Sequence, residues 1–95
     1  MAKRLTVTNY SSTITTGGAA QTAIAANAKR TFLLVQNPPT NTENISVDFG
    51  AVAVGDGTDL TLEPGAVVIF DSAVPHEYVS VIAATTSTKF IMKEG

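Results

Sequence analysis

The sequence predicts an all-β fold, a compact antiparallel β-sandwich or jelly-roll-like domain of about eight short strands. Apolar and polar residues alternate along several short runs, as they do in a strand with one buried side. The runs are rich in Val, Ile, Thr and Phe, which favour strands. Turn residues separate them, such as the paired glycines at 17–18, the paired prolines at 38–39 and Gly-Asp-Gly at 55–57.

The alternation assigns one side of each expected strand to the core. In ISVDF (45–49), the parity directs Ile45, Val47 and Phe49 inward and Ser46 and Asp48 outward. Segment 19–29 (AAQTAIAANAK) contains alanines that favour helix, but Ile24 has no apolar partner at helical spacing, so we expect extended chain. By the same parity, the remaining inward residues are Leu5, Val7, Leu60, Leu62, Val79, Val81, Ala83, Phe90 and Met92.

Two runs, FLLV (32–35) and AVVIF (66–70), are apolar on both sides. A sandwich strand has one core side and one solvent side, so the second side needs a cover from a loop, the N-terminal segment or another subunit. In the first run, either Phe32 with Leu34 or Leu33 with Val35 fills the core. Just before it, we expect Lys29 and Arg30 in a turn, with their charged groups in water and their stems on apolar surface.

Length and composition indicate one domain over residues 1–95, in which residues 1–16 form an extended arm that contacts a neighbour. Charged residues make up only 15% of the chain, against roughly 25% in an average soluble domain, which suits a protein that contacts other proteins. The net charge of −2 and the absence of a basic patch argue against nucleic-acid binding. No apolar run reaches the ~20 residues of a membrane helix, and no signal peptide or membrane association is expected.

Catalytic and metal-binding motifs are weak. His76 and Glu77 are adjacent and would point to opposite sides of a strand, so they form no local dyad, and we expect a surface histidine. Asp56 and Asp59 resemble part of a calcium loop but lack its remaining ligands. We therefore favour a turn at these residues and keep a bound cation as the alternative. The chain has no cysteine. We therefore expect no enzyme activity, cofactor or metal.

A resemblance adds to these observations. The segments that carry it are AANAKRTFLLVQNP (25–38), ISVDFG (45–50), LEPG (62–65), VSVIAATT (79–86) and KFIMKEG (89–95). Together they resemble small β-sandwich virion proteins of tailed bacteriophages, of the capsid decoration, cement or head-fibre type.

The resemblance implies a structural virion protein that is made in the host cytoplasm. It would bind the major capsid protein on the outer surface of the head and stabilise capsomer junctions, commonly as a homo-oligomer, a trimer or dimer. The alternative is a receptor- or glycan-binding module of a tail or head fibre, for which Tyr10, Tyr78, Asn41 and Asn44 supply aromatic and amide groups.

Segment 1–14 (MAKRLTVTNYSSTI) is a candidate for strand addition to a neighbour. The partner-interface residues that we expect from these patterns are Leu5, Val7, Tyr10, Leu33, Val35, Ile82 and Ile91.

Overall fold

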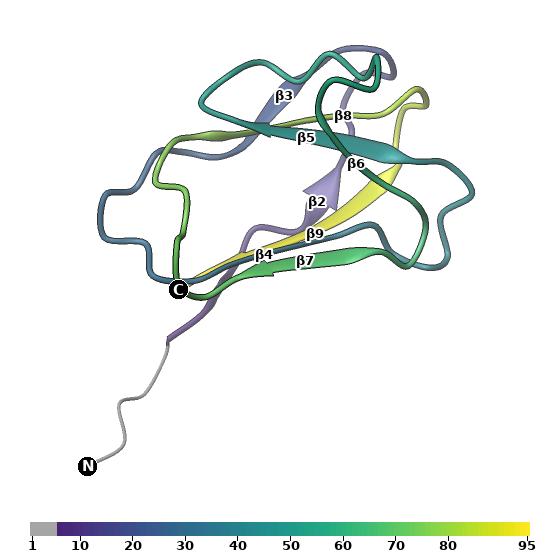
Figure 1. Cartoon of the computed structure of the whole chain (residues 1–95). Helices are drawn as coiled ribbons and strands as arrows, with labels where there is room; N and C mark the ends of the chain where they lie inside the picture. Colours follow the sequence, from purple (N-terminus) through teal and green to yellow (C-terminus); the bar gives the residue numbers. More distant parts are fainter. Residues whose placement is uncertain (1–5) are drawn as a thin grey trace.

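The fold is an all-β sandwich, as the sequence predicts. The structure is a computed structural model that describes residues 6–95, and every helix or strand element within them is a strand. Figure 1 shows two layers of strands facing each other. The strands are β1 (Thr8–Asn9), β2 (Ser12–Thr13), β3 (Gln21–Ile24), β4 (Leu33–Gln36), β5 (Ile45–Phe49), β6 (Leu60–Leu62), β7 (Val67–Phe70), β8 (Val79–Ile82) and β9 (Lys89–Glu94).

The two layers are antiparallel sheets. One contains five strands in the order β1-β9-β4-β7, with β2 also paired to β9. The other contains four strands in the order β3-β8-β5-β6. From β2 onward, the chain changes sheet at every connection except the one between β5 and β6, so the core is built largely from residues distant in sequence.

The N-terminal strands lie on the protein's own sheet. Thr8 and Asn9 pair with Glu94 and Lys93, and β2 pairs with residues 89–90 of the same strand. The arm expected over residues 1–16 is thus docked on its own chain over residues 8–13. Its contact with a neighbour stays a prediction, and Leu5 lies outside the described residues.

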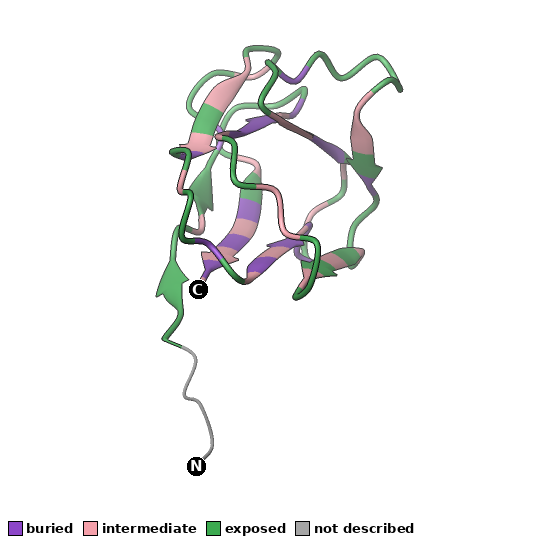
Figure 2. Ribbon diagram, turned by 60° about the vertical axis from the view of Figure 1, so that its left-hand side comes forward, coloured by how far each residue is buried: buried purple, intermediate pink, exposed green. Residues whose placement is uncertain are grey.

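The core lies between the sheets and follows the predicted parity except at Val7, which the alternation directs inward and which is 44% exposed. Figure 2 shows buried residues alternating with less buried ones along strands of the sandwich. In β4 the structure selects Leu33 and Val35 for the core, both fully buried, and turns Leu34 outward. The other buried core residues are Ile14, Ile24, Ile45, Val47, Leu62, Val79, Val81, Ala83, Phe90 and Met92.

Arg30 corrects the sequence prediction, because its charged group is inside the protein and not in water. The residue is 1% exposed, and its Nε donates to Glu94 Oε1 at 2.6 Å. Its two terminal nitrogens donate to the backbone carbonyls of Pro75, Glu77 and Ala25. A buried guanidinium is tolerated only when it is paired and hydrogen-bonded, as it is here. Arg30 therefore closes one end of the sandwich.

Asn37 closes the opposite end of β4 with a neutral group. Its side chain is fully buried, and Nδ2 donates to the carbonyls of Glu43 at 2.8 Å and Leu62 at 2.9 Å. Its Oδ1 accepts a hydrogen bond from Asn41 Nδ2 at 2.7 Å. Because both amide atoms have partners, this buried polar side chain holds the turn at 37–43 against β6.

Candidate functional site

An uncovered apolar surface lies on the outer side of the five-stranded sheet. Its members, which we call the outer apolar face, are Leu34, Val67, Ile69 and Ile91. Leu34 lies opposite Ile69 in the β4–β7 ladder, so these two side chains share one side of the sheet. Val67 and Ile91 flank Gln36 on its two neighbouring strands.

Two members of the outer apolar face are strongly exposed. Val67 is 48% and Ile69 53% exposed, while Leu34 and Ile91 are half-buried. The row that contains Leu34 continues through Lys93 on β9 to Asn9 on β1. Lys89 and Lys93 flank Ile91 on the same side of β9, so the face has two cations at its rim. Contiguous exposed apolar side chains with a polar rim are typical of an interaction site. The face lies on the second side of β4 and β7, where the sequence predicts that the runs FLLV (32–35) and AVVIF (66–70) need a cover.

The outer side of the four-stranded sheet is different, because the chain covers part of it. Residues 50–59 fold over β8, and the backbone N–H of Ala53, which is 2% exposed, donates to Ser80 Oγ at 3.0 Å. Asp59 holds the same loop by accepting hydrogen bonds from the N–H groups of Val54 at 2.7 Å and Gly55 at 2.8 Å. Ser80 is consequently buried although the parity directs it outward.

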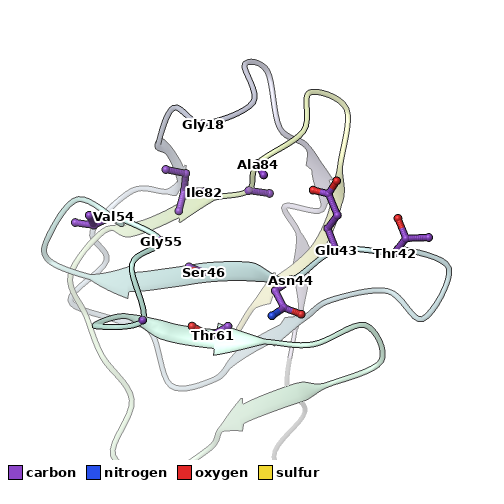
Figure 3. A pocket seen from close by; sticks show the side chains of 12 residues that line it. Gly18, Thr42, Glu43, Asn44, Ser46, Val54, Gly55, Thr61, Ile82 and Ala84 are labelled. Carbon is purple, nitrogen blue, oxygen red and sulfur yellow. The ribbon is translucent and has the colours of Figure 1, made fainter.

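An open groove of about 690 Å³ lies beside this loop. Figure 3 shows Ile82, Ser46 and Thr61 on its floor and Glu43 at one side. Glu43 is the one charged residue that lines it; its Oε1 accepts a hydrogen bond from Thr85 Oγ1, and its Oε2 is enclosed without a partner among the described residues. The lining offers hydroxyl, amide and carboxylate groups, with no aromatic ring.

The predicted interface residues do not form one surface. Leu33 and Val35 are core residues with no exposed area, so neither offers a surface to a partner, and the outward side of this strand carries Leu34. Ile82 lines the groove on one sheet, and Ile91 belongs to the outer apolar face of the other. Val7 and Tyr10 are exposed near β1, and Leu5 lies outside the described residues. Whether the surface members bind a partner stays a prediction.

Sequence reasoning missed Val67 and Ile69, the most exposed members of the outer apolar face. The signal was present, because AVVIF (66–70) is apolar on both sides. What the sequence lacked was the position of this strand at the edge of its sheet, next to β4 alone.

The acidic loop forms a turn. Asp56 Oδ1 accepts hydrogen bonds from the hydroxyl and the backbone N–H of Thr58, which lower the pKa of Asp56. Asp59 binds backbone N–H groups instead of facing Asp56 as a shared ligand pair. Within residues 6–95, no three His, Asp or Glu side chains are grouped as a metal site would require.

The structure also shows where His76 and the residues expected for a glycan-binding site lie. His76 is exposed, and its backbone carbonyl accepts a hydrogen bond from Asn27. The amide of Asn41 binds Asn37 and the carbonyl of Lys89, so it is used inside the structure. Asn44 lines the groove, whereas neither Tyr10 nor Tyr78 does. The part of the chain that is described contains no helix long and apolar enough to cross a membrane.

A scan against protein-family models, a search of curated proteins and a search of solved structures each found no match. The function is therefore inferred from the residues and geometry of this chain. Its most prominent feature is an apolar surface on one sheet, and the second is a polar groove on the other.

Proposed function

We propose that this chain is a non-enzymatic structural protein of a phage virion, a decoration or cement protein. It binds the major capsid protein on the outer surface of the head, at capsomer junctions. The observation that carries this proposal is the outer apolar face, which leaves Val67 and Ile69 about half exposed on the five-stranded sheet. The resemblance of the sequence to small phage virion proteins supplies the class of partner.

The physical basis of this binding is burial of apolar surface. Covering apolar area contributes about 25 cal/mol per Å² before the costs of association. A protein that binds only the assembled shell shifts the equilibrium toward assembly by mass action. The members of the outer apolar face carry no charge, but Lys89 and Lys93 flank Ile91 on the same side of β9. We therefore expect apolar burial to contribute most of the binding and only the part due to these two lysines to weaken with salt.

The test is co-sedimentation of the purified protein with expanded heads of the phage that encodes it. We expect the natural protein to sediment with the heads and Ile91→Lys to remain in the supernatant, because a lysine on the outer apolar face is costly to bury. Thr61→Lys, at an exposed position on the other sheet, is the matched control and should bind normally. A natural protein without affinity for heads, or Ile91→Lys that binds equally well, contradicts the proposal.

The groove gives limited support to the alternative, a receptor- or glycan-binding module of a tail or head fibre. Asn44, Ser46 and Thr61 present hydrogen-bonding groups there, but sugars commonly bind against aromatic rings and none lines this groove. If the natural protein binds glycans on an array and Asn44→Ala does not, the result would support this alternative function. An array without hits would leave the outer apolar face as the candidate site.

A further inference from the structure

We propose that β7 is a homodimer contact, at which two copies pair antiparallel about a two-fold axis at Val68. The pairing joins the two five-stranded sheets into one continuous sheet. It goes beyond the proposed function and does not rest on it, since it concerns only contact between copies.

The first step is that β7 is the unprotected edge of the sandwich. Natural sheet edges are protected by short strands, bulges, charges or prolines. Strands β1 and β2 have two residues each, β3 has a register shift between Thr22 and Ile24, and β6 is a three-residue strand between Asp59 and Glu63. By contrast, β7 (Val67–Phe70) has four paired residues, no register shift, and no charge or proline within the strand, and Asp71 is the one charge directly beside it.

The second step is that both sides of β7 lack cover. Val67 and Ile69 are exposed on the outer side. On the inner side, Val68 and Phe70 are only half-buried, and so is Phe49, whose ring meets that of Phe70 edge-on at 5.4 Å. The sandwich is thus incompletely closed beside β7. A strand added here must be apolar on both of its sides.

The third step identifies the occupant. Among the sheet edges of residues 6–95, β7 itself is the strand with large apolar side chains on both sides. A second copy of β7 therefore supplies what the first one lacks, which is the self-complementarity of a two-fold interface. Because the strand carries no charge, the pairing brings no like charges together.

The register follows from the backbone. The carbonyl of Ala66 accepts a hydrogen bond from the N–H of Asn37, so it points toward β4. Backbone groups alternate in direction along an antiparallel strand, which turns those of Val67 and Ile69 toward the free edge. Val67 then exchanges hydrogen bonds with Ile69 of the second copy, and Val68 lies opposite its own equivalent.

Neighbouring registers are less favourable. A shift by one residue would place inward side chains opposite outward ones, which a continuous sheet does not allow. A shift by two in one direction would place the carboxylate of Asp71 opposite Val67 of the second copy, and in the other direction it would place Gly65, which has no side chain, opposite Ile69. The register centred on Val68 pairs apolar residues alone.

The first test measures molar mass against concentration by sedimentation velocity. We expect a monomer–dimer equilibrium that is lost in Ile69→Pro, which removes a free-edge N–H without removing a donor to β4. Val67→Lys should also give monomers and leaves the backbone intact. Ile91→Lys, on the same side of the sheet but on β9, is the matched control and should still dimerise. Loss of head binding without loss of the dimer in this control separates the two proposals.

The second test is a disulfide at the expected axis. The natural chain has no cysteine, and residues opposite each other in a non-hydrogen-bonded pair have Cα atoms about 4.5 Å apart, within reach of a disulfide. Val68→Cys should form covalent dimers on mild oxidation much faster than Thr22→Cys on the β3 edge. A natural protein that stays monomeric, a dimer that persists in both edge variants, or equal cross-linking of the two cysteine variants overturns the proposal.

Discussion

The Arg30 end of the sandwich and the β7 edge both carry side chains in a location that is unusual for their type. At the Arg30 end a charged group is inside, and every nitrogen of its guanidinium has an acceptor. At the β7 edge apolar groups are outside, and nothing in the described chain covers Val67 or Ile69. The chain thus satisfies the buried guanidinium of Arg30 by itself and leaves the exposed apolar groups of β7 to a partner. Variants at the first region should change stability, and variants at the second should change association.

The largest effect is expected for Arg30→Met, which leaves the carboxylate of Glu94 buried without its cation. Breaking a buried pair from one side costs about 3–5 kcal/mol in the free energy of unfolding. Urea denaturation measures this loss. Lys29→Met, at the exposed neighbouring position, is the control and should stay within about 0.5 kcal/mol of the natural protein.

A double variant shows whether the pair acts as a unit. Arg30→Met combined with Glu94→Gln removes both charges, so the loss should be smaller than the sum of the two single losses. Additive losses would mean that the two charges are held independently.

Asn37→Ala should have the next largest effect, at the neutral end of β4. It leaves the carbonyls of Glu43 and Leu62 without their donor, which costs on the order of 2–3 kcal/mol in the free energy of unfolding. Asn44→Ala, at an exposed asparagine, provides the control in the same denaturation experiment. Equal stability of the two variants would show that Asn37 does not hold the turn at 37–43.

The comparison also shows how far the sequence could predict this fold. In β5, β8 and β9 apolar and polar residues alternate, so parity alone identified core residues such as Val47, Val81 and Met92. In the run FLLV (32–35) both sides are apolar, so its own alternation does not identify the core side. The one local signal is the polar Gln36, which lies on the side of Leu34 and favours Leu33 and Val35 as the core residues.

Arg30 was misplaced because its partner Glu94 lies 64 residues away. A signal existed: Glu94 continues the inward series of Phe90 and Met92, and a carboxylate on the core side requires a cation. The candidate surface was only partly predictable, because the sequence does not show that the loop at 50–59 covers one sheet and that the other stays open.

Ser80→Ala tests the covered sheet and should have a moderate effect. The variant removes the acceptor for the buried N–H of Ala53, at a cost of about 1–2 kcal/mol in unfolding free energy. It should also speed hydrogen exchange at Ala53 more than at residues of β9. The exposed Ser72→Ala is the control, and unchanged exchange at Ala53 would show that the loop is held by other contacts.

Ile69→Thr should have the smallest effect on the stability of the monomer. It is therefore the sharpest test of the contrast between the Arg30 end and the β7 edge. Ile69 is 53% exposed, and threonine keeps the β-branched shape that favours a strand, so the free energy of unfolding of the monomer should change by no more than about 0.5 kcal/mol. The same change removes apolar area from both proposed contacts, and association should weaken measurably in sedimentation and in head binding. A residue that contributes to association and almost nothing to monomer stability is what a contact surface requires. A large loss of monomer stability in Ile69→Thr would instead make the β7 edge part of the protein's own core, and the contrast with Arg30 would disappear.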